Sequence, residues 1–121
     1  MGSYKDLIVY KKAYSLAMDI LKKSRSFPAE EKYSLTDQIR RSSRSVCANI
    51  GEAYRRKQYP AHFVSKLTDS NAENTETEIW IQFSFDCSYF NETEYRNFLG
   101  RCEEVGRILG FMIKHPERFC K

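Results

Sequence analysis

The stretch that decides the fold runs from Tyr33 to Lys57 and reads YSLTDQIRRSSRSVCANIGEAYRRK. On a helical wheel with about 100° per residue, its apolar side chains fall within an arc of about 60°. These side chains are Leu35, Ile39, Val46, Ile50 and Ala53. An arc of this width is typical of the face that a helix buries. The stretch therefore predicts an amphipathic helix whose apolar face lies in a protein core.

Arginines gather nearly opposite the apolar arc and predict a basic stripe that faces solvent. The stripe and its extension at the end of the helix consist of Arg40, Arg41, Arg44, Arg55, Arg56 and Lys57. These six side chains are the candidate phosphate contacts if the partner is RNA or DNA. The formal net charge of +4 and the pI near 8.9 leave two interpretations open. The stripe is either a nucleic-acid surface or a basic face that meets water or another subunit.

Small polar residues lie between these two surfaces and recur at near-heptad spacing, which makes one continuous row along the helix. The row consists of Gln38, Ser42, Ser45, Asn49 and Glu52. Hydroxyls of this size let another helix approach closely. We predict that the row, together with Trp80, forms a contact between copies of the chain. The alternative is packing inside the chain against the polar centre of the helix predicted over 60–88, since buried polar groups need partners.

Three other segments repeat apolar residues every three or four positions, as helices do. The helices are predicted at about 5–26, 30–57, 60–88 and 92–114. The second begins either near Glu30 or at Ser34, where Asp37 three residues later suggests a capping box. The apolar repeat of the first helix is Leu7, Tyr10, Ala13 or Tyr14, Ala17 and Leu21. Short breaks between helices of this length predict an all-α, antiparallel, up-down-up-down four-helix bundle, with 1–121 as a single domain.

The composition excludes several other classes of protein. At 121 residues, with 41% apolar and 30% charged residues, the chain is expected to fold around a core of its own. Its four cysteines form no CxxC pair and have no histidine at zinc spacing, so neither a metal site nor a disulfide framework is predicted. No apolar run approaches the ~18 residues of a membrane span. We therefore expect a cytoplasmic protein.

The same residues give no sign of catalysis. His62 and His115 are isolated in the sequence, and no nucleophile and base motif is present. The acidic group of Glu73, Glu76 and Glu78 lacks the ExxH spacing of di-iron bundles. We predict that the protein is not an enzyme, needs no cofactor and has no small-molecule substrate.

Charge is distributed unevenly along the chain. Residues 1–29 carry six bases and two acids, and residues 30–60 carry seven bases and four acids. Residues 61–90 carry one base and five acids. The first two helices are therefore basic and the third is acidic, which favours contact between helices of opposite sign.

The run from Phe27 to Arg56 resembles the signature of the 23S rRNA-intervening sequence proteins, a bacterial family of four-helix bundles. That signature has a Phe-Pro turn, a Tyr-Gly-Leu-Thr-x-Gln start, paired arginines and an Asn-Ile-Ala-Glu-Gly segment. Residues 7–13 resemble the first helix of the family, and residues 76–80 resemble its third. Two departures are Ser34 in place of Gly, and Gly51-Glu52-Ala53 in place of Ala-Glu-Gly. The second departure moves the glycine, where a kink or a close contact is expected.

The resemblance implies a bundle without catalytic activity that assembles into a ring-like homo-oligomer, a pentamer. Some members of the family are encoded within insertions of large-subunit ribosomal RNA genes. A related bundle, the accessory protein of diversity-generating retroelements, is a basic pentamer that works with nucleic acid. The first hypothesis is therefore an oligomeric scaffold that presents the arginine stripe to RNA or DNA. The alternative is a protein-interaction adaptor with no nucleic-acid role.

Overall fold

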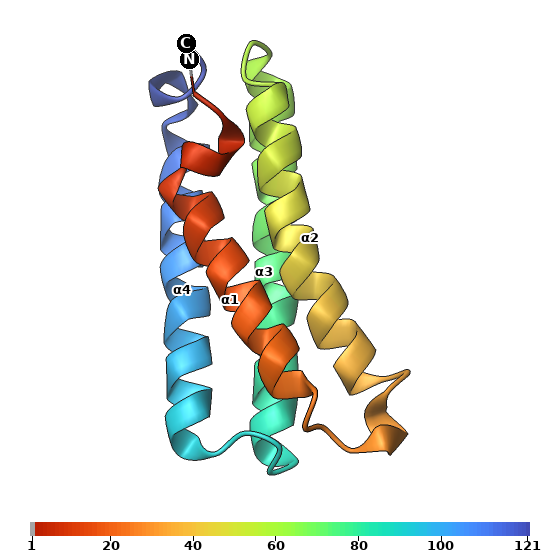
Figure 1. Cartoon of the computed structure of the whole chain (residues 1–121). Coiled ribbons are helices and arrows are strands. Elements are labelled where there is room, and N and C mark those ends of the chain that lie inside the picture. Colours follow the sequence, from red (N-terminus) through yellow and green to blue (C-terminus); the bar gives the residue numbers. More distant parts are fainter. Residues whose placement is uncertain (1) are drawn as a thin grey trace.

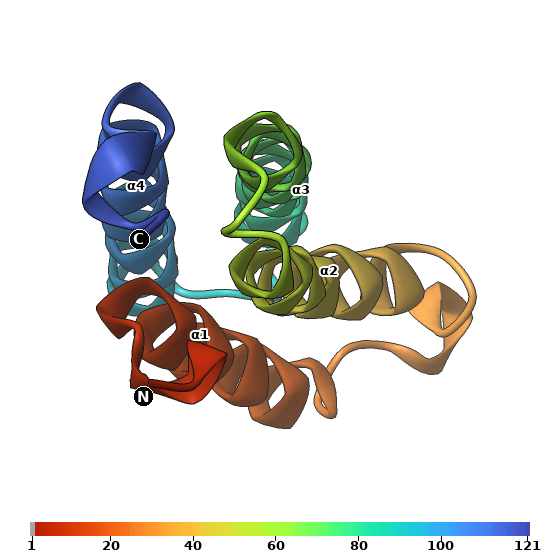
Figure 2. The ribbon, with the colours of Figure 1, turned by 90° about the horizontal axis from the view of Figure 1, so that it is seen from above.

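The structure, a computed structural model, describes residues 2–121 and contains four long helices over that range. They are α1 (Ile8–Ser24), α2 (Leu35–Arg55), α3 (Pro60–Asp86) and α4 (Glu92–Lys114). The helices alternate in direction, and the described part of the chain has no strand (Figure 1). Each helix packs against two others, so that α1 lies diagonally across from α3 (Figure 2). The predicted all-α four-helix bundle is confirmed.

Helix α1 begins later than predicted, and α2 begins at the second of its two predicted starts, with Ser34 as the N-cap residue, because 3₁₀ turns precede both helices. The turn η1 (Tyr4–Asp6) precedes α1, and the turn η2 (Ala29–Glu31) precedes α2. The capping box predicted at Ser34 is absent, because the Ser34 hydroxyl donates to Glu31 Oε1 at 2.6 Å. This hydrogen bond, followed by one from the Tyr89 hydroxyl at 2.8 Å, lowers the pKa of Glu31 below its ordinary value. The fourth helix begins as predicted, with a capping box between Asn91 and Glu94.

The core has two apolar clusters, one toward each end of the bundle. The cluster near the chain termini includes Val9, Ile50 and Leu109. The cluster at the other end includes Ile20 and Ile39. All five apolar side chains of the α2 arc predicted from the sequence are buried.

Hydrogen bonds replace apolar contacts at the middle of α3, where the helix is polar. The Ser70 hydroxyl donates to the carbonyl of Val46 on α2 at 2.8 Å. The Asn74 amide donates to the carbonyl of Cys102 on α4 at 2.8 Å. These side chains are buried, as is Thr77, which donates to a hydroxyl on α2. The alternative interpretation of the polar centre, packing inside the chain, is the one that the structure bears out.

The first helix is apolar on two faces, where the sequence analysis treated it as having one. The face toward the core carries Val9, Leu16 and Ile20. Tyr10 and Leu21, which the sequence analysis assigned to the core repeat, line a groove next to α2 together with Tyr14 and Met18. This second apolar face stays accessible because α1 and α2 leave a groove between them.

Candidate functional site

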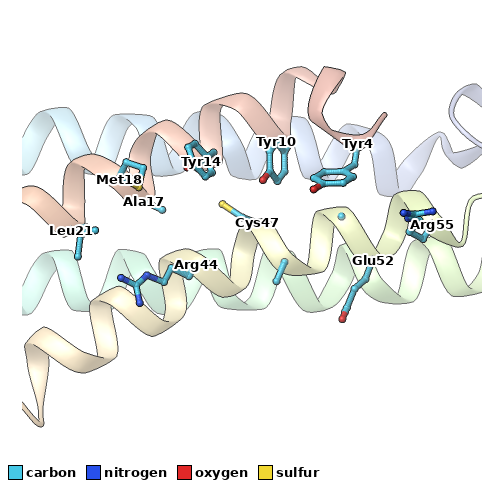
Figure 3. Close-up of a pocket in the computed structure, with 12 residues that line it drawn as sticks. Tyr4, Tyr10, Tyr14, Ala17, Met18, Leu21, Arg44, Cys47, Glu52 and Arg55 are labelled. Atoms are coloured by element: carbon cyan, nitrogen blue, oxygen red, sulfur yellow. The ribbon is translucent and has the colours of Figure 1, made fainter. Parts of the chain in front are cut away.

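The groove between α1 and α2 has a volume of about 600 Å³ and is mostly apolar (Figure 3). Tyr4 and Tyr10 meet edge to face with their ring centroids 5.0 Å apart, and Tyr10 stacks on Tyr14 at 6.0 Å. The three rings form a row along one wall. The middle of the facing wall, which α2 forms, carries small side chains. The lining residues of that wall include Cys47, Ala48 and Gly51.

Two features of the α2 wall were not clear from the sequence. The helix runs without a break through Gly51, and the nearest atom to a Cβ placed there would be in the Tyr4 ring at 3.7 Å. Because 3.7 Å is an ordinary van der Waals distance, a methyl group would fit there, and Gly51 marks neither a break in the helix nor an unusually close contact. Burial raises the pKa of Cys47 to about 11, so its thiol stays protonated at neutral pH and acts as part of an apolar surface.

Arginines stand at the two ends of the groove. Figure 3 places Arg44 near Leu21 at one end and Arg55 near Tyr4 at the other. Neither arginine forms an ion pair with a carboxylate among residues 2–121. The groove is thus an apolar surface with an arginine at each end, and its lining also includes the carboxylate of Glu52, which pairs with Lys66.

A second concave surface, which we call the basic cleft, lies on the N-terminal half of α2 and has a volume of about 690 Å³. Four cationic side chains and one carboxylate line it. They are Lys32, Arg40, Arg41, Arg44 and Asp37. Tyr33 lies at its edge with 85% of its surface exposed. Arg44 lines both the basic cleft and the groove.

The six predicted phosphate contacts are not equally free. Arg41 forms ion pairs with Glu73 and Glu76 of α3, which raise its pKa. The Arg40 guanidinium donates to the Ser24 hydroxyl at 2.7 Å. Lys57 donates to the Tyr54 hydroxyl at 3.1 Å, and its ammonium lies 4.2 Å from the centre of that ring.

Three of the six, Arg44, Arg55 and Arg56, are exposed and have no ion pair within the described chain. Lys32 adds a cation that the sequence analysis missed. The η2 turn places Lys32 beside the basic cleft, although the predicted helix over 30–57 gave it no such position.

The polar row on α2 faces α3 of the same chain. Ser42 is fully buried and accepts a hydrogen bond from Thr77 at 2.8 Å. Ser45 donates to Glu73 at 3.1 Å, and Glu52 pairs with Lys66 at 3.0 Å. Because a side chain with no exposed surface cannot touch another chain, we correct the prediction for Ser42. Its role is to pack α2 against α3.

The remaining members of the predicted interface keep some exposure. The Gln38 side chain accepts from Arg41 at 3.2 Å, and the Asn49 amide donates to the carbonyl of Ser45 at 3.0 Å. Trp80 is half-buried and donates to Glu76 at 3.2 Å. These contacts all lie within one chain, so they explain the polar row without a second copy.

Exposed apolar residues lie on α3 next to Trp80. Ile79 has 48% of its surface exposed and Phe83 has 51%. Their separation of four residues puts them on one side of the helix.

Two further observations concern metal binding and membrane insertion. Among residues 2–121, no group of three or more His, Cys, Asp or Glu side chains is placed to hold a metal ion. None of the helices is both long enough and apolar enough to cross a bilayer.

Comparison with known proteins identifies the family. A family model described as 23S rRNA-intervening sequence protein matches residues 5–110. The chain belongs to this family. The match covers all of α1, α2 and α3, together with most of α4.

A solved structure also resembles the chain. It is the crystal structure of a protein of unknown function from the S23 ribosomal protein family of Bacteroides thetaiotaomicron. The two share 28% sequence identity and a TM-score of 0.79, over 88% of this chain and 96% of the other. No curated protein matches the chain. The descriptions of the family and of this relative name no reaction, so a function has to be argued from the surfaces.

Proposed function

We propose that the protein is a homo-oligomeric scaffold without catalytic activity, which binds the phosphate backbone of RNA or DNA through the basic face of α2. The observation that carries this proposal is the basic cleft. Its wall holds Lys32, Arg40, Arg41 and Arg44 against a single carboxylate, Asp37. Surplus positive charge in a concave surface attracts a polyanion, and neutralised phosphates release their counterions.

The arrangement of the cations suits a backbone more than a single small anion. Arg40 and Arg44, which both line the basic cleft, lie four residues apart on α2, which is about 6 Å along its axis. A nucleic-acid strand can follow that line, since its phosphates repeat at regular spacing. Arg41 is held by α3, so it contributes less than Arg44 does.

The test is the affinity for a fluorescently labelled 20-nucleotide RNA, measured by anisotropy between 25 and 200 mM salt. We expect the logarithm of the association constant to fall linearly as the logarithm of the salt concentration rises. Lys32→Glu, which changes the basic cleft and not the groove, is expected to weaken binding about tenfold or more at low salt. The matched control is Arg107→Glu, which makes the same charge change on the exposed side of α4. Equal effects of the two variants would contradict a localised site.

A second candidate function is a protein-interaction adaptor. The apolar groove and the exposed pair of Ile79 and Phe83 favour it, because unpartnered apolar surfaces of this kind mark protein contacts. The same titration separates the candidates. If the wild-type protein shows no affinity for RNA or DNA at 25 mM salt, the nucleic-acid role is excluded and the adaptor remains.

A further inference from the structure

The outer face of α3, which we call the α3 ridge, carries a row of exposed residues. Exposed residues follow one another along it at helical spacing within an arc of about 80°. They are Ser65, Thr68, Ala72, Thr75, Ile79 and Phe83. Side chains are small over the first half of the ridge and large and apolar over the second. No Lys or Arg lies on this arc.

We propose that the groove between α1 and α2 accepts the α3 ridge of a second copy of this chain. Ile79 and Phe83 then lie between the tyrosine row of one wall and the small residues of α2. This inference rests on the homo-oligomer of the proposed function and specifies which two surfaces meet in it.

Charge complementarity selects the occupant. Residues 61–90, which include α3, carry five acids and one base, whereas the groove is built by the two basic helices. On the ridge side, Asp86 follows Phe83 by one turn, and Glu76, whose charge is partly neutralised by Arg41 of its own chain, precedes Ile79 by one turn. These acids are ten residues apart, about 15 Å along the helix. The arginines at the ends of the groove, Arg44 and Arg55, are about 17 Å apart by the same measure.

The contact has to be between copies, because one chain cannot bring its own two surfaces together. The groove lies between α1 and α2, and α3 is diagonal to α1 (Figure 2). Each copy therefore offers one groove and one α3 ridge. A contact between two different surfaces is called heterologous. When it repeats from copy to copy, a closed ring forms if the successive rotations add up to a full turn.

Single variants test the two surfaces. We expect wild-type protein to be oligomeric by light scattering on a sizing column. Phe83→Glu, on the α3 ridge, and Tyr14→Glu, in the groove, are both expected to give monomers. Both positions are 51% exposed, so the bundle should still fold, and circular dichroism checks that. The control is Ile8→Glu, on an apolar residue that is 65% exposed and does not line the groove, and it should keep the wild-type mass.

Mixing the two monomeric variants gives a sharper test. The Phe83→Glu chain keeps an intact groove, and the Tyr14→Glu chain keeps an intact α3 ridge. An equimolar mixture should form a heterodimer of twice the chain mass and nothing larger, because each partner has one damaged surface. No association on mixing would overturn the inference.

The outcomes separate this inference from the proposed function. A wild-type oligomer whose mass is unchanged by Phe83→Glu and Tyr14→Glu would overturn the groove contact and leave the scaffold intact. A monomeric wild-type protein at 100 μM would remove both. RNA affinity is read independently, since Phe83 does not line the basic cleft.

Discussion

The amide of Asn74 is the most consequential single group in the core. It donates to the carbonyl of Cys102 across the bundle, while the Cys102 thiol lies 3.1 Å from the amide oxygen. We expect Asn74→Ala to lower the free energy of unfolding by about 1–3 kcal/mol, because it removes a buried hydrogen bond between α3 and α4 and leaves a void where the amide packed. Urea unfolding measures this. The control is Asn97→Ala on exposed α4 surface, which should change stability by less than about 0.5 kcal/mol.

Two glycines one turn apart on α4 should respond oppositely to substitution. A Cβ at Gly110 would meet no atom within 4 Å, so Gly110→Ala should stabilise the protein by about 0.5–1 kcal/mol through helix propensity. A Cβ at Gly106 would lie 3.2 Å from the Asn74 amide nitrogen. Gly106→Ala must shift that amide by a few tenths of an ångström, which strains its hydrogen bond to Cys102, and should therefore be the less stable variant. Thermal melting of both variants checks the order, and a more stable Gly106→Ala would contradict it.

Burial was predictable wherever a helix has one apolar face, and it was not where a helix has two. The α2 arc from Leu35 to Ala53 is buried as predicted, since an apolar stripe nearly opposite a row of arginines leaves only one face that can enter the core. For α1, the wheel could not tell Tyr10, which lines the groove, from Leu16, which is buried. Both side chains are apolar, and only the tilt of the neighbouring helix decides which of them is covered.

Ion pairs between α2 and α3 were less predictable, because they depend on which side chains the packing brings together. The sequence showed a basic helix followed by an acidic one, and the structure pairs Arg41 with Glu73 and Glu76. Nothing in the spacing singled out Arg41 from Arg44. The part of the basic stripe that stays free for a partner could therefore be identified only from the structure.

The Arg41 pairs make a prediction about pH. The hydrogen bond from Arg41 holds the pKa of Glu76 below its ordinary value of 4.5. Since the folded pKa is the lower one, the contribution to stability is present above pH 4.5 and is lost as the pH falls through the folded pKa. We expect Arg41→Ala to cost less than about 1 kcal/mol at pH 7, because the side chains are partly exposed.

That cost should shrink as the pH falls below 4.5 and through the lower pKa that Glu76 has in the folded protein. Urea unfolding at neutral and acid pH measures it. Arg107→Ala, which removes a charge without removing an ion pair, is the control and should show no such pH dependence. A cost for Arg41→Ala that is the same at both pH values would mean that packing of the side chain, rather than charge, stabilises the contact.

Over the whole molecule, positive charge collects on α1 and α2, and negative charge on α3. A single copy satisfies part of this through the pairs of α2 with α3. The groove and the α3 ridge remain without a partner. The groove is concave and lies between two basic helices, whereas the ridge is convex and lies on the acidic helix. If copies join through them, several basic clefts are carried on one particle. Linked sites bind a long ligand more tightly than a short one, because later contacts form at high effective concentration.

Assembly should therefore show in the dependence of affinity on RNA length. We expect wild-type protein and the Phe83→Glu variant to bind a 10-nucleotide RNA with similar affinity, since either can use only one basic cleft. On a 60-nucleotide RNA the wild-type protein should bind at least about tenfold more tightly than Phe83→Glu, because several clefts engage one strand. Ile8→Glu should behave as wild type on both lengths. Equal affinity of Phe83→Glu and wild type for the long RNA would mean that the oligomer does not present its clefts along one path, and that binding is a property of the single bundle.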